Sequence, residues 1–139
     1  MRKFNELAIV SLVFILCSCG DVLSNARIGN VERVQNGLDA GVSIEKRDHL
    51  GNTLLMIAAE NKQYETLEYL YKKGANVNAQ NNNGSTALIM AAYYNHLDTA
   101  KILVKYNANK TIKDKYGNTA LDYAEQFGYV PMIAVLKNE

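Results

Sequence analysis

The chain lacks several of the residues on which enzymes and metal proteins are most often built. Its 139 residues include no tryptophan, one proline, two histidines and two cysteines. Both cysteines, Cys17 and Cys19, fall within the first 19 residues, so the rest of the chain cannot supply a thiol nucleophile or a thiolate zinc site. His49 and His96 stand far apart, and the metalloprotease, redox and phosphate-binding motifs are all missing. We therefore expect no catalytic residue, no metal and no cofactor.

Charge of one sign is also lacking. The chain carries 15 basic and 14 acidic residues, and beyond residue 18 the two kinds are equally frequent, with 13 of each. A nucleic-acid-binding protein presents a basic footprint, and attraction to anionic lipid needs a basic cluster. The composition therefore predicts neither a nucleic-acid partner nor a broad electrostatic attachment to lipid.

The N-terminal apolar run, Leu7 to Leu16, is too short to span a bilayer, which needs about 20 apolar residues. It follows Arg2 and Lys3, and its length is typical of the apolar core of a secretory signal. The segment Leu16-Cys17-Ser18-Cys19-Gly20 that comes next resembles a bacterial lipoprotein box. This resemblance implies a signal peptide over residues 1–18, cleavage before Cys19, and attachment of acyl chains such as palmitate to Cys19.

The lipoprotein hypothesis places the protein in a bacterial cell envelope, on the periplasmic side or at the cell surface. Cys17 is a poorer lipidation site, because Leu16 is bulky where a small residue is needed. The alternative is an ordinary signal, cleaved or uncleaved, with two incidental cysteines. Since the first expected helix begins two or three residues after Cys19, either the folded part lies close to the membrane or its first repeat unravels to act as a tether.

One pattern recurs three times at a spacing of 33 residues, as Gly51–Ala59, Gly84–Ala92 and Gly117–Glu125. A period of this length indicates stacked supersecondary units, each of which buries its apolar face against its neighbours. In every copy a glycine suits a turn with positive φ, a threonine two residues later can cap a helix, and a leucine points to the core. These positions are Gly51, Gly84 and Gly117, then Thr53, Thr86 and Thr119, then Leu55, Leu88 and Leu121.

The period, the Gly-x-Thr-x-Leu core and the paired alanines resemble the ankyrin repeat family. The resemblance implies an all-α solenoid, in which each repeat is a β-turn, two antiparallel helices and a loop. We expect about four repeats, including partial N- and C-terminal caps, over residues 19–48, 49–81, 82–114 and 115–139. The second helices are expected at about 63–73, 96–106 and 130–138, with Gly74 and Asn107 ending the first two.

Some positions depart from the family pattern. Gly37 stands where Leu70 and Leu103 stand in later copies, so we expect the first repeat to lack a core side chain. Met56, Ile89 and Asp122 replace the usual histidine, and we expect its hydrogen bond to be lost. Asp122 and Glu125 suit a terminal cap whose outer face meets water. His96 is expected to do structural work at the start of a helix.

Partners of ankyrin repeats usually lie across the turn tips and the exposed side of the first helices. The corresponding turn-tip residues here are His49, Leu50, Asn52, Asn82, Asn83, Ser85, Lys115, Tyr116 and Asn118. The ends of the first helices contribute Glu60, Asn61, Tyr93, Tyr94, Gln126 and Phe127. Tyrosine is favoured at binding hot spots, so Tyr93 and Tyr116 are the foremost contact candidates. The alternative for Tyr94 and Phe127 is packing between repeats.

These observations favour a monomeric, non-enzymatic protein–protein interaction module, anchored to the envelope through Cys19, with a partner protein that the sequence does not identify. A narrower version is a protector or inhibitor that masks an enzyme or toxin in the same compartment. A second class is a stress-related structural protein of the envelope. Small-molecule binding or catalysis is the least favoured reading, because no polar constellation supports it.

Overall fold

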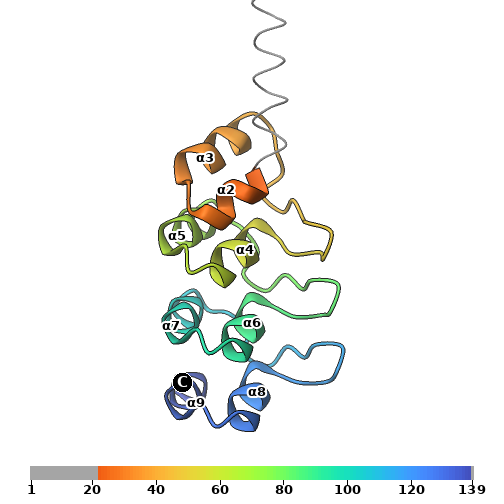
Figure 1. Ribbon diagram of the computed structural model, residues 1–139, viewed down its shortest axis with the longest axis vertical. Coiled ribbons are helices and arrows are strands. Elements are labelled where there is room, and N and C mark those ends of the chain that lie inside the picture. Colours follow the sequence, from red (N-terminus) through yellow and green to blue (C-terminus); the bar gives the residue numbers. More distant parts are fainter. Residues whose placement is uncertain (1–21, 139) are drawn as a thin grey trace, which may run out of the picture.

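The computed structural model describes residues 22–138, and the regular elements of this part are helices. The eight helices form four antiparallel pairs (Figure 1). They are α2 (Val22–Ile28) with α3 (Val31–Asp39), α4 (Leu54–Glu60) with α5 (Tyr64–Lys72), α6 (Ala87–Tyr93) with α7 (Leu97–Lys105), and α8 (Ala120–Gln126) with α9 (Val130–Lys137). The predicted second helices correspond to α5, α7 and α9.

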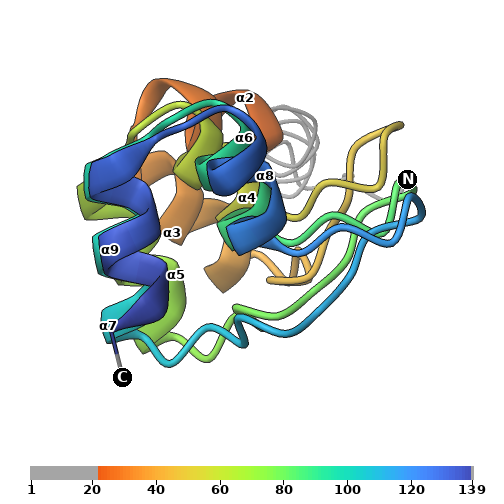
Figure 2. The ribbon, with the colours of Figure 1, turned by 90° about the horizontal axis from the view of Figure 1, so that it is seen from below.

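The pairs stack into two layers. Helices α2, α4, α6 and α8 form one column, and α3, α5, α7 and α9 form the other (Figure 1). A view along the stack shows the long loops projecting from the first-helix column, away from the second helices (Figure 2). This arrangement confirms the predicted all-α repeat solenoid.

Threonine caps define where three of the first helices begin. The Oγ1 atoms of Thr53, Thr86 and Thr119 accept hydrogen bonds from the backbone N–H three residues later, at 3.2 to 3.3 Å. Each cap satisfies one of the N–H groups that a helix start leaves unpaired. Since these helices have only seven residues, they are too short to be stable alone, and packing between repeats must supply most of their stability.

The expected loss of the histidine's hydrogen bond is wrong for the last repeat. Asp122 Oδ2 accepts from the Thr119 backbone N–H and from its hydroxyl, both at 2.8 Å, while Asp122 N–H donates to Thr119 Oγ1. The two residues thus form a reciprocal capping box. In the second repeat Met56 Sδ lies 3.5 Å from the Thr53 nitrogen, and a thioether is only a weak acceptor.

The core runs through the stack, between successive first helices and between each first helix and its paired second helix. The apolar residues of α4, from Leu54 to Ala59, are each at most 2% exposed, because α4 packs against α2 on one side and α6 on the other. Small side chains such as Ala91 and Ala92 let neighbouring helices approach closely. Leu121 is less buried than Leu55 and Leu88, because no further helix of the described part covers the outer side of α8.

Gly37 does not leave a hole in the first repeat. It is buried, and a Cβ built at this position would lie 3.0 Å from Val22 Cγ2. Val22 is fully buried, so its side chain occupies the space next to the glycine. The first repeat thus lacks the core side chain that Leu70 and Leu103 supply in later repeats, as expected, and the neighbouring Val22 side chain lies close enough to leave no room for one.

Hydrogen bonds tie each long loop to the next. The backbone N–H groups of Asn82 and Lys115 donate to the carbonyl oxygens of Leu50 and Asn83, at 3.0 and 2.9 Å. Arg47 Nη1 donates to Gln80 O at 2.7 Å, and Gln80 Nε2 donates to Lys113 O at 3.2 Å. Because these bonds join equivalent positions in successive repeats, the loops form a second stack beside the helices.

The turn glycines permit this close stacking. Gly51, Gly84 and Gly117 have φ angles of +78°, +72° and +82°, which favour glycine. A Cβ on Gly51 would lie 2.9 Å from the backbone nitrogen of Asn82, and one on Gly84 would lie 3.0 Å from that of Lys115. A Cβ on Gly117 would meet nothing within 4 Å.

This difference gives a matched pair of variants for measuring the loop contact. Gly117→Ala should lower the free energy of unfolding by about 1–2 kcal/mol, the cost of a left-handed conformation for alanine. Gly51→Ala carries the same cost and a clash with a backbone atom, so it should lose at least about 1 kcal/mol more. Urea unfolding of both variants checks the difference. Equal losses would contradict a tight contact between the loops.

Candidate functional site

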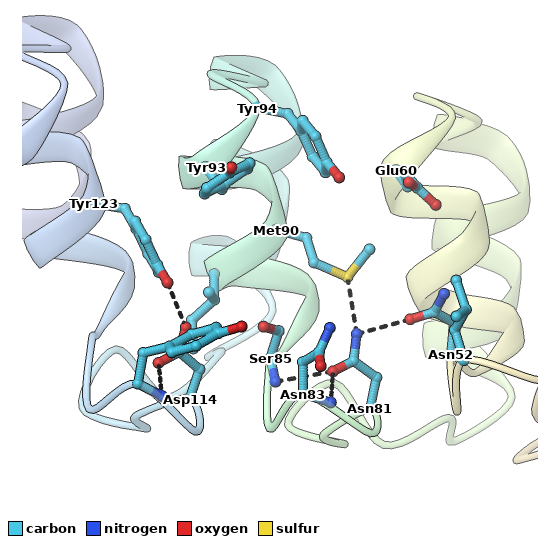
Figure 3. A pocket seen from close by; sticks show the side chains of 13 residues that line it. Asn52, Glu60, Asn81, Asn83, Ser85, Met90, Tyr93, Tyr94, Asp114 and Tyr123 are labelled. Carbon is cyan, nitrogen blue, oxygen red and sulfur yellow. Dashed lines mark hydrogen bonds between the residues drawn. The ribbon is translucent and has the colours of Figure 1, made fainter.

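A cleft of about 320 Å³ opens between the first helices and the long loops (Figure 3). Its walls come from α4, α6, α8 and the tips of three successive loops. The lining residues are Leu50, Asn52, Glu60, Asn81, Asn83, Ser85, Ile89, Met90, Tyr93, Tyr94, Asp114, Tyr116 and Tyr123. We call this feature the concave cleft.

Large exposed apolar side chains gather along the same side of the solenoid. Eight such residues are exposed in the described part of the chain, and six of them lie at loop tips or at the ends of first helices. These six are Ile28, Leu50, Tyr93, Tyr94, Tyr116 and Phe127, and we call them the concave strip. The other two, Tyr64 and Val130, begin second helices. Sequence reasoning had missed Ile28, although it occupies the same register as Tyr94 and Phe127.

Tyr93 lies at the centre of an aromatic cluster. Its ring meets those of Tyr94, Tyr123 and Phe127 edge to face, with centroids 5.1, 5.3 and 5.6 Å apart. Such pairs are favourable because the positive edge of one ring faces the negative face of another. Tyr94 and Phe127 remain 51% and 42% exposed. Their contact with Tyr93 therefore coexists with a large exposed surface, and Phe127 also connects α8 to α6.

The loops are shaped by one acidic or amide side chain each. Asp48, Asn81 and Asp114 stand 33 residues apart, three residues before each turn glycine. In every case Oδ1 accepts from the backbone N–H groups two and four residues later, at 2.9 to 3.1 Å. These are Asx turns, in which the side chain replaces a backbone acceptor. The regular spacing was the signal that could have revealed them.

Asp114 also joins the last loop to α8. Its Oδ2 accepts from the Tyr123 hydroxyl at 2.6 Å, and the residue is 8% exposed. Burial raises the pKa of Asp114, but hydrogen bonds from Tyr123, Asn118 and Tyr116, with the charge of Lys115, outweigh burial and hold the pKa below its ordinary value. The pKa of Tyr123 is raised, chiefly by its hydrogen bond to Asp114. At neutral pH the pair is therefore an ionised carboxylate and a neutral phenol.

The predicted contact residues of the loops differ in how far they are exposed. His49, Asn82, Asn83 and Lys115 are exposed at the loop tips, and Ser85 and Asn118 are half-buried. Lys115 Nζ donates to Asn83 Oδ1 at 2.6 Å and lies 5.0 Å from the centroid of the Tyr116 ring.

Asn52 does not belong to the exposed surface on which it was predicted. It is 5% exposed. Its amide nitrogen donates to Asp48 Oδ2 at 3.2 Å, and its oxygen accepts from Asn81 Nδ2 at 2.9 Å. Asn52 instead forms the floor of the concave cleft, where both ends of its amide are used to link two loops.

His96 caps α7 through its backbone position and makes no side-chain cap hydrogen bond. Burial, assisted by the charge of Lys62, lowers its pKa, so the ring is neutral at pH 7. Residues 22–138 contain no group of three or more His, Cys, Asp or Glu side chains arranged to hold a metal ion. None of the helices in the same range has both the length and the apolar character needed to cross a membrane.

A family model described as "Ankyrin repeats (3 copies)" matches residues 23–81 and 55–139. The chain belongs to the ankyrin-repeat family. Comparison with the curated proteins gave no match. Ankyrin repeats are generally protein–protein interaction modules and typically lack enzymatic activity, so the repeat array is a candidate binding surface for a partner protein.

The geometry of this ankyrin array fits that role chemically. The concave strip presents aromatic and aliphatic surface on a rigid framework. The concave cleft lies between its loop-tip residues and its first-helix residues, and amide and carboxylate groups line the floor of the cleft. Interfaces are enriched in tyrosine and phenylalanine at their centres. The residues that carry the surface are distinct from the glycines, threonines and Asx residues that hold the ankyrin framework.

Asp114 should make the stability of the array sensitive to acid. Because its folded pKa lies below the unfolded value of about 3.9, the unfolded state binds more protons at low pH, and stability must rise with pH. The contribution of Asp114 is complete above about pH 5 and is lost as pH falls through about 4 toward the folded pKa. Asp114→Asn should cost about 1–3 kcal/mol at pH 7 and progressively less below pH 4.

Urea unfolding at pH 7, 5, 4 and 3 measures this difference. Asp39→Asn is the matched control, since Asp39 is an exposed aspartate at the end of α3. A loss in Asp114→Asn that stays constant from pH 7 to pH 3 would contradict the assigned role of the carboxylate.

Proposed function

We propose that the concave strip binds a partner protein and that the array holds this partner at a bacterial envelope without transforming it chemically. One observation carries the proposal: six of the eight large exposed apolar side chains in the described part lie on one side of the molecule. Exposed apolar side chains that gather on one side of a protein mark interaction sites. The partner is a protein rather than a nucleic acid, and the array acts as a monomer.

The rigidity of the strip supports this role. Tyr93 is held by three ring contacts. Tyr116 lies two residues after Asp114, and its backbone N–H donates to Asp114 Oδ1, which fixes the backbone of the loop. Tyrosine offers a large contact area with few rotatable bonds. Because the contact residues are ordered before binding, little conformational entropy is lost when a partner docks.

Attachment to the envelope rests on the N-terminal sequence. The signal segment 1–18 and Cys19 lie outside the described residues, so the support is the lipoprotein-like box itself. Two or more acyl chains give stable anchoring, which a single chain does not. Helix α2 begins at Val22, three residues beyond Cys19, and packs on α3 and α4. These contacts favour a folded first repeat held close to the membrane over an unravelled tether.

Substitution at the two cysteines tests the anchor. In the producing bacterium, Cys19→Ser should abolish incorporation of radiolabelled palmitate and move the protein from the detergent phase to the aqueous phase of a Triton X-114 separation. Cys17→Ser is the matched control and should keep both properties, because only Cys19 follows a small residue. Labelling that survives in Cys19→Ser would refute the anchor while leaving the binding surface untested by this result.

Removal of two exposed rings tests the surface. Full-length protein is used to capture proteins from detergent-solubilised envelope extract, and retained proteins are identified by mass spectrometry. The double variant Tyr93→Ala with Tyr116→Ala should lose the retained partner. Because three ring contacts of Tyr93 are lost, its thermal midpoint should fall by several degrees, so capture is carried out at a temperature at which circular dichroism shows that the variant is folded. Tyr64→Ala is the control, because Tyr64 is an exposed tyrosine on a second helix. Equal capture by the double variant would overturn the site assignment.

The captured protein would also separate the narrower versions of the function. Retention of a secreted enzyme or toxin, with loss of its activity on binding, specifies a protector or inhibitor. Retention of an envelope component whose assembly fails without the array specifies a structural role.

A further inference from the structure

We propose that the concave cleft receives an arginine side chain of the partner. Its guanidinium group would lie against the exposed surface of the Tyr93 and Tyr94 rings on one side and bind the carboxylate of Glu60 on the other. This inference rests on the proposed function and names the chemistry that the surface selects. It depends on three features of the described residues, which are the charge of the cleft, the placement of Glu60 and the orientation of the rings.

The charge of the cleft is of one sign. Its lining includes two carboxylates, Glu60 and Asp114, and no lysine, arginine or histidine. Asp114 is already engaged by two backbone N–H groups and the Tyr123 hydroxyl. Glu60 makes no side-chain hydrogen bond or ion pair within residues 22–138. Lys115 is not a lining residue, but it lies at the loop rim of the cleft, where its Nζ donates to Oδ1 of the lining residue Asn83 at 2.6 Å. The cleft therefore offers one uncompensated negative charge.

Glu60 carries its charge at an unfavourable place on its helix. It is the last residue of α4 and is half-buried, and a negative charge at a helix C-terminus is opposed by the helix dipole. The equivalent positions in the next two repeats hold neutral residues, Tyr93 and Gln126. Arg27 holds the equivalent position in the first repeat, but it forms no ion pair with Glu60. A cation from a partner would supply the missing counter-charge.

The rings beside Glu60 suit a flat cation. Tyr94 extends from α6 toward Glu60 on α4, with Tyr93 next to it (Figure 3). The two rings are nearly perpendicular, at 87°, so they present surfaces in two directions. Aromatic faces attract cations, and the ammonium group of Lys115 already lies over the Tyr116 ring, 5.0 Å from its centroid. A guanidinium group can stack on a ring and at the same time bind a carboxylate through two parallel hydrogen bonds, which an ammonium group cannot.

The size of the cleft agrees with a single side chain. At about 320 Å³ it is at the small end of the range for ligand pockets. Exposed apolar residues flank the cleft, with Leu50 and Tyr116 at the loops and Tyr93 and Tyr94 at the end of α6. They provide apolar surface for the partner residues that precede and follow the inserted arginine.

Selection of peptides tests the inference without knowledge of the natural partner. Full-length protein in non-ionic detergent is used to select from a phage-displayed library of random dodecapeptides, and the residue frequencies of bound and unbound pools are compared. Arginine should be enriched on the native chain and not on Glu60→Gln. Glu65→Gln is the matched control, because Glu65 is exposed on α5 outside the cleft, and it should retain the enrichment.

A selected peptide then gives a quantitative test. Replacing its arginine by citrulline, which has nearly the same shape and no charge, should weaken binding to the native chain by about tenfold or more, and binding to Glu60→Gln by less than about twofold. Replacement by lysine should give an intermediate loss.

The outcomes separate the two proposals. Peptides that lose binding in the Tyr93→Ala/Tyr116→Ala variant, but show no arginine enrichment, would overturn this inference and leave the binding surface intact. Arginine enrichment that persists in Glu60→Gln would also overturn it. If the native chain selects no peptide, or if the tyrosine variant selects the same peptides, the arginine site is refuted and the concave strip is refuted with it.

Discussion

No repeat of this protein can bury its apolar face alone, and every other feature depends on this constraint. The first helices are only seven residues long and become stable when they lie between neighbours. The completely buried apolar face of α4 shows the result, since α2 covers one side and α6 the other. The loops obey the same rule, because their backbone hydrogen bonds run from one repeat to the next. Stacking in both layers produces a continuous and rigid surface.

The rigid framework and the binding surface use different positions of the repeat. Glycine, threonine and the Asx residue return in each full copy, because they set the turn, the cap and the loop. Other positions of the repeat hold unlike residues in successive copies. One such position is occupied by Glu60, Tyr93 and Gln126, and another by Leu50, Asn83 and Tyr116. Substitution at these sites alters the chemistry of the surface, while the glycine, threonine and Asx positions preserve the turns, caps and loops, which is how a common architecture can serve different partners.

The local features of the fold could be predicted from the sequence, and the contacts between repeats could not. The 33-residue period predicted the helix pairs, and Thr53, Thr86 and Thr119 were predicted as caps because a hydroxyl before an apolar helix has few other roles. Asn52 was placed at the surface because its turn position gave no sign of the partners that bury it, Asp48 and Asn81 of two successive loops.

The same limit applies to the candidate site. Tyr93, Tyr94 and Tyr116 were predicted as contact residues because tyrosines at family contact positions favour binding, and this remains a prediction. The Tyr123–Asp114 bond and the packing of Val22 against Gly37 could not be predicted, because they depend on which neighbours meet across the stack. Glu60 was identified as a helix-end residue, but its lack of a counter-charge becomes visible only when the cleft around it is assembled.

Site-specific photocrosslinking in the producing cells tests the central claim, that the concave strip binds a partner protein, most directly. A benzophenone amino acid is placed at residue 93 on the strip or, as a control, at residue 64 on α5, and the cells are irradiated. We expect a discrete crosslinked product of higher mass from position 93 and none from position 64. No product from position 93, or the same product from both positions, would contradict it.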